Sequence, residues 1–454
     1  MSFKVINPAT GEQIRELPAW NETEIEAALA QVAAATPAWA ATPMAERCGL
    51  MRKAAEVLRA NRDRYAAIIT EEMGKLIRDA RAEVEKCATV CDYYAEHGPA
   101  FLADEHIASD ASDSYVAYLP LGTVLAVMPW NYPFWQVMRF AAPALVAGNT
   151  GVLKHASNVP GSALALEEVF REAGFPEGVF RSLMIRASQV EKVIADPRIH
   201  AVTLTGSEPA GRQVAASAGQ VLKKCVLELG GSDAFIVLED ADLDEAVKWA
   251  VTSRFLNSGQ SCIAAKRFIL VDAIAEDFLT RFKAGVEALQ AGDPMDEATT
   301  LGPMARADLR DELHEQVKRS LSAGAVALTG CEPLERPGAY YAASILDRVE
   351  PGMAAYHEEL FGPVAIVIHA RDEEDALRIA NDSPFGLGGS VWTRDSARGA
   401  ALARRVASGC TFVNGMVKSD PRLPFGGIKN SGFGRELSQH GIREFVNAKT
   451  IWVK

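Results

Sequence analysis

The feature that most constrains the fold of this chain is an alternation of strand-like and helix-like segments that begins near residue 115. Short runs rich in β-branched residues occur at 115–119, 123–128, 151–153, 179–185, 201–204, 226–229 and 235–238. Segments with helical periodicity occupy 159–173, 189–195, 210–218 and 243–257. Strands that take turns with helices predict βαβ units and parallel sheets, so the expected fold class is α/β.

Other segments extend this pattern in both directions. A second α/β series has strands at 267–271 and 364–368 and helices at 274–289, 308–323 and 373–381. A turn at 7–11 precedes a helical region that starts with a capping box of Asn21 and Glu24, breaks near Pro43 and ends at about His97. The strand-like end at 450–454 needs a partner edge. A chain of 454 residues exceeds one hydrophobic core, which predicts two or three domains.

Composition argues against several classes of protein. Hydrophobic residues make up 48% of the chain, but no apolar run reaches the roughly 18 residues needed to cross a bilayer, so a membrane protein is not expected. The formal net charge of −12 opposes binding to nucleic acid or acidic membranes, which leaves small molecules as the expected partners. The first residues lack the charged-then-apolar order of a signal peptide, so we expect a cytoplasmic protein.

The cysteines indicate neither a disulfide framework nor a metal site. Their number is odd, and their spacing contains no CxxC pair and no zinc-type Cys/His pattern. The seven are Cys48, Cys87, Cys91, Cys225, Cys262, Cys331 and Cys410.

Cys262 differs from the other cysteines in its setting. It ends a polar, glycine-containing run at 257–262 that separates apolar segments at 246–256 and 268–271. A thiolate presented by such a loop attacks carbonyl carbon well, and nearby backbone N–H groups help to hold the negative charge. We therefore interpret Cys262 as a nucleophile; the alternative is an ordinary free cysteine.

Glu228 is the candidate general base. It lies inside an apolar strand that ends in two glycines, at 225–231, where burial would raise the pKa of its carboxyl group toward a useful range. The alternative is a buried carboxylate paired with a basic residue for structure. Cys262 follows after about one more strand and one helix, which predicts that both residues reach the carboxyl edge of one doubly wound sheet, where ligands bind.

Asn131 and Arg139 are two further candidates. Asn131 lies between two prolines directly after a strand, and an amide held in this way can donate to an oxyanion, although asparagine is also a common turn residue. Arg139 lies four residues beyond Trp135 in an otherwise apolar helix. A guanidinium in an apolar wall indicates a bound carboxylate or, with equal weight, a structural ion pair.

The cofactor candidates lie at two other strand ends. Thr205, Gly206 and Ser207 follow a strand and open a helix, and free N–H groups at such a junction suit a phosphate, although Ser207 could be only an N-cap. Lys154 and Ser157 follow the next strand and could contact ribose or phosphate, or could simply be solvated. The sequence contains no GxGxxG fingerprint, so a standard Rossmann pyrophosphate turn is not expected.

Taken together, six motifs in order over nearly the whole chain resemble the aldehyde dehydrogenase superfamily. They are Pro-Trp-Asn at 129–131, Leu-Thr-Gly-Ser at 204–207, Leu-Glu-Leu-Gly-Gly at 227–231, Gly-Gln-Ser-Cys at 259–262, Glu-Leu-Phe-Gly-Pro at 359–363 and Pro-Phe-Gly-Gly at 424–427. The resemblance implies two Rossmann-like α/β domains and a small β oligomerisation element. On this basis we expect a cofactor-binding domain of residues 1–108 and 122–230, a catalytic domain of 231–435, and an oligomerisation element of 109–121 and 436–454 in a homodimer or homotetramer.

The resemblance also implies a mechanism. Cys262 attacks an aldehyde, Asn131 and the Cys262 backbone N–H stabilise the oxyanion, and hydride leaves the thiohemiacetal for the nicotinamide. Glu228 then activates the water that hydrolyses the thioester. Of the implied cofactor contacts, Glu359 and Phe361 hold the nicotinamide ribose end, Ser207 meets the pyrophosphate and Lys154 the adenosine ribose; Trp130, Ser157, Thr205 and Gly206 complete the set.

Two segments depart from the usual family pattern. Many members have an acidic residue at the position of Ser157, and a carboxylate there would repel a 2′-phosphate that serine can hydrogen-bond. We therefore predict that NADP is preferred and NAD is also used. The segment at 183–189 is shorter than the usual glycine-containing loop, so cofactor contacts there are not carried over.

The substrate side resembles the succinate-semialdehyde dehydrogenase branch, in its bacterial and cyanobacterial form with a single catalytic cysteine. The resemblance implies that Arg139 and Ser419 bind the distal carboxylate and that Trp135 and Phe425 line the substrate tunnel. The expected reaction is the oxidation of succinate semialdehyde to succinate. The nearest alternative is another small or aromatic aldehyde with Arg139 serving structure; a CoA-dependent acyl-transferring relative, a Cys/His hydrolase and a non-catalytic structural protein such as a lens crystallin are disfavoured.

Overall fold

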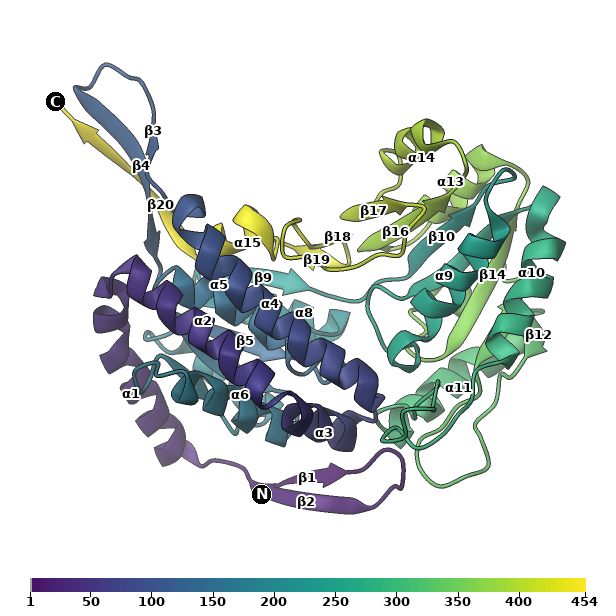
Figure 1. Cartoon of the computed structure of the whole chain (residues 1–454), viewed down its shortest axis with the longest axis horizontal. Coiled ribbons are helices and arrows are strands. Elements are labelled where there is room, and N and C mark those ends of the chain that lie inside the picture. Colours follow the sequence, from purple (N-terminus) through teal and green to yellow (C-terminus); the bar gives the residue numbers. More distant parts are fainter. Residues whose placement is uncertain (1) are drawn as a thin grey trace.

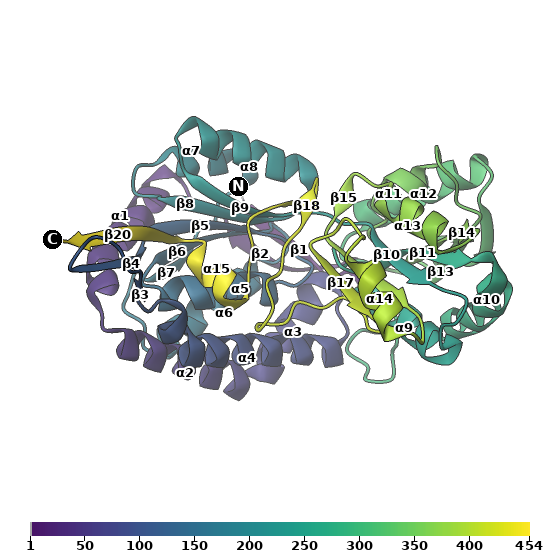
Figure 2. The same ribbon diagram turned by 90° about the horizontal axis from the view of Figure 1, so that it is seen from above.

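The computed structural model describes residues 2–454 and has two α/β lobes with a projecting three-stranded arm (Figure 1). The first half of the chain builds one lobe and most of the second half builds the other. Viewed from above, the last part of the chain returns from the second lobe across the first and ends in the arm (Figure 2). The structure confirms the predicted α/β class with parallel sheets.

The chain begins with a hairpin and four helices. Strands β1 (Ser2–Ile6) and β2 (Gln13–Pro18) pair antiparallel around the predicted turn. Asn21 and Glu24 form the predicted capping box at the start of α1, because each side chain accepts a hydrogen bond from the other's backbone N–H. The helices are α1 (Glu22–Ala41), α2 (Met44–Ala60), α3 (Arg62–Met73) and α4 (Ile77–Phe101), with the predicted break at Pro43.

The sheet of the first lobe has six strands. Five are parallel, in the order β7 (Phe180–Ser182), β6 (Thr150–His155), β5 (Thr123–Met128), β8 (Ala201–Thr205) and β9 (Lys224–Glu228). A short strand from the end of the chain, β19 (Gly432–Phe433), adds antiparallel to β9. The helices that connect the strands of this sheet are α5 (Trp135–Val146), α6 (Pro160–Glu172), α7 (Val190–Ala195) and α8 (Glu208–Gln220).

The strand predicted at 179–185 is wrong in extent, since β7 covers only three residues. Leu183 and Ile185 are buried in a hydrophobic cluster, although they lie beyond the end of β7. The apolar run therefore reflects packing rather than strand pairing.

The sheet of the second lobe has seven strands; six are parallel to one another, and the edge strand β12 pairs antiparallel with β13. Their order is β12 (Val326–Thr329), β13 (Ser344–Asp347), β14 (Val364–Ala370), β11 (Ala265–Val271), β10 (Asp233–Val237), β16 (Gly388–Trp392) and β17 (Cys410–Val413). The helices are α9 (Leu243–Phe255), α10 (Asp272–Glu287), α11 (Ala307–Ser322), α12 (Ala354–His357), α13 (Glu373–Asn381) and α14 (Ser396–Ala403). Strands β12, β13, β16 and β17 were not predicted, and β16 in particular begins with two glycines that carry little strand propensity.

The arm combines segments that are far apart in the sequence. Strand β4 (Asp113–Pro120) pairs antiparallel with β3 (Glu105–His106) on one side and with β20 (Val446–Val453) on the other. The terminal strand thus finds the partner edge that the sequence required. Just before it, α15 (Ser438–Arg443) contacts α4 and α5 of the first lobe, and β18 (Ile428–Lys429) pairs with β15 (Phe385–Gly386) of the second.

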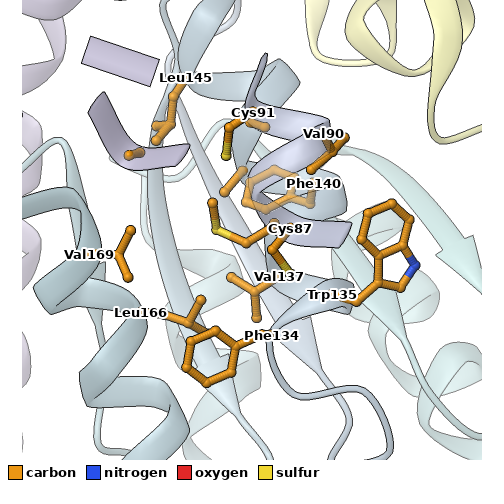
Figure 3. Close-up of a cluster of buried hydrophobic side chains, with 14 of the residues drawn as sticks. Cys87, Val90, Cys91, Phe134, Trp135, Val137, Phe140, Leu145, Leu166 and Val169 are labelled. Carbon is orange, nitrogen blue, oxygen red and sulfur yellow. The ribbon is translucent and has the colours of Figure 1, made fainter. Parts of the chain in front are cut away.

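Helix α5 crosses the core of the first lobe. All twelve of its residues are buried, as expected for a helix that is apolar on nearly every face. Figure 3 shows Phe134, Val137 and Phe140 within the buried cluster beside Cys87 and Cys91 of α4, with the indole of Trp135 at the edge of the cluster. Within residues 2–454, no helix combines the length and apolarity needed to cross a membrane.

Candidate active site

The loop that carries Cys262 is held in an unusual backbone conformation. It leaves α9 through a short 3₁₀ turn in which Asn257 and Ser258 adopt left-handed φ values of 55° and 53°. Gly259 follows with a φ of 73°, and a Cβ there would collide with the carbonyl oxygen of Gly362. The strained turn is therefore fixed by close contact with the 359–363 segment, and it places Cys262 half-buried on the wall of a cavity of about 200 Å³.

The predicted sheet edge for Cys262 is wrong. Glu228 ends β9 at the carboxyl edge of the first sheet, as expected, but Cys262 precedes β11 and so lies at the amino edge of the second sheet. A crossover helix returns the chain to the start of the next parallel strand, not to its end, so one strand and one helix bring the chain back to the opposite edge. The two residues belong to different sheets.

The electrostatic surroundings of Cys262 work in two directions. Burial raises the pKa of the thiol to about 12, and the charges of Arg139 and Lys266 oppose this rise. The Lys266 ammonium donates to the carbonyl oxygens of Ser261 and Cys262, each at 2.9 Å, and pairs with Glu359 at 3.1 Å. Lys266 thus connects the cysteine loop to a residue expected on the cofactor side, and sequence reasoning missed it. Its only signal was a basic residue at the start of a buried strand.

Asn131 lies against the cysteine loop, as the oxyanion role requires. Its side chain is buried, and Nδ2 donates to the carbonyl oxygen of Gln260 at 3.2 Å. Since an amide nitrogen carries two hydrogens, one N–H remains for a ligand. The Asn257 amide in turn donates to the Asn131 carbonyl at 2.9 Å, which fixes the two loops together.

A buried ion pair supports the Asn131 loop from below. Lys75 pairs with Glu83 of α4 and also donates to the Asn131 carbonyl at 3.0 Å. The other oxygen of Glu83 accepts from the backbone N–H groups of Phe134 and Trp135, at 2.9 and 3.0 Å, and so caps the start of α5. No sequence pattern predicts this pair, because Lys75 lies in the short connection between α3 and α4, Glu83 lies within α4, and the burial of both depends on tertiary packing.

The carboxyl group of Glu228 is buried without a protein partner. Both of its oxygens lack a hydrogen bond within the described residues, and the group is 2% exposed. Burial raises its pKa well above the usual value; Glu436 adds to the rise, while Arg139 and Arg435 oppose it. One oxygen lies against Gly426, where a Cβ would come within 2.6 Å, so the group faces the loop after β17.

Arg139 forms the structural ion pair that was the alternative to a substrate contact. Its Nε pairs with the carboxylate of Glu436, and Nη2 donates to the Thr205 hydroxyl at 3.3 Å. Phe425 and Glu436 exchange two backbone hydrogen bonds of 2.7 Å, and the Phe425 ring lies 4.8 Å from the guanidinium carbon. Arg139 and Phe425 both line the cavity with Cys262, so a substrate contact by Arg139 stays a prediction.

Ser419 and Trp135 also line the cavity, and a lysine that sequence reasoning missed joins them. The Ser419 hydroxyl oxygen accepts from Trp135 Nε1 at 3.0 Å and from Lys86 Nζ at 2.9 Å. The Lys86 ammonium lies 4.1 Å from the Trp135 ring. Lys86 is on α4 three residues after the buried Glu83, and that helix face was its only sequence signal.

The predicted cofactor residues gather at the carboxyl edge of the first sheet. Ser207 is the N-cap of α8, and its side chain makes no capping bond, so the first backbone N–H groups of α8 are free of that partner. Lys154 at the end of β6 has its pKa lowered by burial and makes no ion pair within residues 2–454. Ser157 is exposed just beyond it. Free N–H groups and an unpaired cation at this edge fit a phosphate-containing ligand.

Trp130, Glu359 and Phe361 are the residues predicted for the nicotinamide end, and each makes a defined contact within the protein. The rings of Trp130 and Phe361 meet edge to face with centroids 5.8 Å apart. Glu359 accepts a hydrogen bond from the Gly231 N–H at 3.1 Å, and a Cβ at Gly230 would collide with its carboxylate. Gly230 is therefore required for the close approach of this loop.

All seven cysteines are free. In the part of the chain that the structure describes, no group of three or more histidine, cysteine or acidic side chains is arranged to hold a metal ion.

The sequence pattern of the aldehyde dehydrogenase family matches residues 1–451. The chain belongs to the aldehyde dehydrogenase family.

Relatives of this aldehyde dehydrogenase match it over nearly their whole length. The probable succinate-semialdehyde dehydrogenase (NADP+) of Synechocystis sp. is 52% identical over 100% of both chains. The succinate semialdehyde dehydrogenase (NAD(P)+) Sad of Escherichia coli is 51% identical over 98% of this chain and 97% of its own. The crystal structure of succinic semialdehyde dehydrogenase from Streptococcus pyogenes in complex with NADP+ superposes with a TM-score of 0.98, at 39% identity and 99% coverage of each chain.

Proposed function

We propose that this aldehyde dehydrogenase oxidises succinate semialdehyde to succinate and uses NADP in preference to NAD. The observation that carries the proposal is that the nucleophile Cys262 shares one cavity with Ser419, Trp135 and two cationic side chains, Lys86 and Arg139. An aldehyde with a distal carboxylate suits such a cavity. The relatives of about 50% identity that are named for this substrate support the same conclusion.

Cys262 begins the reaction by attacking the aldehyde carbon. The negative charge that develops on the aldehyde oxygen is held by the free N–H of Asn131 Nδ2 and by the Cys262 backbone N–H. Because burial keeps the thiol pKa high, Arg139 and Lys266 are the charges that favour the thiolate needed for attack. The product of this step is a thiohemiacetal on Cys262.

The proposed cofactor residues come from both lobes, most of them from the carboxyl edge of the first sheet and two from the loop before β14 of the second. The α8 N-terminus at Ser207, after Thr205 and Gly206, suits the pyrophosphate; Lys154 and Ser157 suit the adenosine ribose; and Trp130, Glu359 and Phe361 suit the nicotinamide end. When bound there, a nicotinamide dinucleotide supplies the acceptor for the hydrogen and two electrons that the thiohemiacetal loses as it becomes a thioester. Ser157 presents no negative charge to a 2′-phosphate, which is the reason to expect NADP as the preferred cofactor.

Glu228 completes the cycle as the base that activates water. Burial raises the pKa of Glu228 well above its usual value and so makes the carboxylate a stronger base, and the absence of a hydrogen-bond partner within the described residues leaves its carboxyl group free to turn. The activated water attacks the thioester carbon, the C–S bond breaks, and the acid leaves with Cys262 restored.

The resemblance to the family supports a division of the chain into three domains. Residues 1–108 and 122–230 would bind the cofactor, 231–435 would carry the nucleophile, and 109–121 with 436–454 would join subunits. Trp452 on β20 is 51% exposed and Ile107 beside the arm 52%, which supports burial of this surface in a homodimer or homotetramer. We place the enzyme in the cytoplasm.

Steady-state kinetics test the substrate and the cofactor together. We expect a higher kcat/KM for succinate semialdehyde than for butanal, which has the same chain length without the carboxylate, and a higher kcat/KM with NADP than with NAD. Equal values for the two aldehydes would instead favour a dehydrogenase for another small or aromatic aldehyde, a reading that the Arg139–Glu436 pair also permits.

A further inference from the structure

The cations that border the Cys262 cavity differ in whether a carboxylate already neutralises them. Four basic side chains line it: Lys75, Lys86, Arg139 and Lys418. Lys75 is paired with Glu83 and Arg139 with Glu436. Lys418 is exposed to water. Lys86 is the half-buried one, and within residues 2–454 it has no carboxylate partner.

An ammonium group without a counter-charge is costly away from water. Lys86 has three N–H donors, and the protein supplies one acceptor for them, the Ser419 hydroxyl oxygen at 2.9 Å. The Trp135 ring, 4.1 Å away, covers the ammonium and contributes a cation–π interaction, but it carries no negative charge. Two N–H groups of Lys86 therefore remain for an anionic ligand in the cavity.

The hydroxyl of Ser419 is a second donor beside the Lys86 ammonium. Its oxygen accepts from both Lys86 Nζ and Trp135 Nε1, which occupies both of its lone pairs. The hydroxyl hydrogen must then point away from these two groups, and within the described residues it has no acceptor. Ser419 and Lys86 therefore present an O–H donor and a positive charge to the same part of the Cys262 cavity.

From this arrangement we infer that Lys86 is a specificity-determining residue that holds the distal carboxylate of the substrate together with the Ser419 hydroxyl. The inference rests on the proposed function, since it concerns how a carboxylate-bearing aldehyde is selected. Arg139 contributes less net charge to this task, because Glu436 already balances its guanidinium.

The test compares succinate semialdehyde with butanal in Lys86→Met, which keeps an unbranched apolar side chain and removes the ammonium group. We expect the ratio of the two kcat/KM values to fall by about 10- to 100-fold, through a higher KM for succinate semialdehyde, as the loss of a hydrogen bond to a charged group predicts. The inhibition constant of succinate should rise by a similar factor. Lys86→Arg should keep most of the preference, and Lys418→Met, which removes an exposed charge bordering the same cavity, should keep all of it.

The outcomes separate this inference from the proposed function. A wild-type enzyme that does not prefer succinate semialdehyde over butanal overturns the proposed function. If the wild type prefers succinate semialdehyde and Lys86→Met keeps that preference, only the inference is overturned. The inference is also overturned if Lys86→Met loses kcat/KM equally for both aldehydes, because Lys86 would then only hold Ser419 in place. Melting temperatures show whether the variant is folded, and the pH dependence of succinate inhibition in the wild type gives a test without any variant.

Discussion

The guanidinium of Arg139 and the carboxylate of Glu436 form an ion pair in the interior of the first lobe, with side chains only 2% and 5% exposed. Arg139 belongs to α5, whereas Glu436 lies near the end of the chain, where it is paired through its backbone with Phe425. The pair therefore links the helix behind the active site to the loop that covers it. It also neutralises the cation that the resemblance to the succinate-semialdehyde dehydrogenase branch assigned to the substrate carboxylate.

Removing one member of this pair should destabilise the protein. We expect Arg139→Met to lower the free energy of unfolding by about 3–5 kcal/mol, because Glu436 is left buried without a counter-charge. The double variant Arg139→Met/Glu436→Gln should recover most of the loss, and urea denaturation measures both. A single variant as stable as the wild type would show that water reaches this pair.

Glu228→Gln should slow thioester hydrolysis about 10²- to 10⁴-fold, the usual contribution of a general base. A first turnover of NADPH formation should still be seen as a burst, since attack by Cys262 does not need the base. Stopped-flow absorbance measures the burst and the steady state. The absence of a burst would mean that an earlier step limits the variant.

Glu228→Gln should also be more stable than the wild type at alkaline pH. The folded-state pKa of Glu228 lies well above its usual value, so folding favours the protonated group, and stability is lost as the pH rises from about 4 through the folded pKa. Glutamine does not ionise, so the stability of Glu228→Gln does not fall in this way as the pH rises. We expect its advantage in free energy of unfolding to exceed about 1 kcal/mol near pH 8 and to vanish near pH 4. An advantage that does not change with pH would point to packing instead.

Ser157→Glu should reverse the cofactor preference. A carboxylate beside the 2′-phosphate of NADP is a like-charge contact that costs several kcal/mol, so kcat/KM for NADP should fall about 100-fold while that for NAD holds or rises. Ser157→Ala is the matched control, since it removes the hydroxyl without adding charge. No change in Ser157→Glu would place the 2′-phosphate elsewhere.

Lys75 should act on catalysis through Asn131. We expect Asn131→Ala to lower kcat about 10²- to 10³-fold, as for other oxyanion donors. Lys75→Met should lower kcat less, because it removes the hydrogen bond that holds the Asn131 carbonyl. In the double variant the two losses should not add, and a double-mutant cycle of kcat values measures this. Additive losses would indicate that Lys75 acts on another part of the site.

Succinate inhibition should weaken as Lys86 loses its proton. Burial, with help from Arg139, lowers the pKa of Lys86 to about 8, while Cys87, Glu83 and Asp420 act in the opposite direction. The cation is present below this pKa and lost above it, so the inhibition constant should rise about tenfold between roughly pH 7 and pH 9. A constant value over this range would separate Lys86 from the bound carboxylate.

The sequence by itself determined the α/β class, the capping box at Asn21 and the strand ends that carry Asn131, Lys154, Thr205 and Glu228. These features depend on neighbours in the chain, since periodicity, caps and turns are local. The polar run ending at Cys262 was visible for the same reason. The ordered motifs then led to the family, which the match over residues 1–451 shows.

Only the tertiary structure decided which of these strand ends face each other. It placed Cys262 at the amino edge of a second sheet rather than at the carboxyl edge that carries Glu228, formed β16 from a glycine-rich segment, and gave Arg139 its partner in Glu436. The Lys86–Ser419 contact joins residues from α4 and from the segment after β17, so no local pattern could reveal it. Pairing and burial between distant segments are properties of the folded chain, because they depend on how sheets and helices pack rather than on the order of residues within one element.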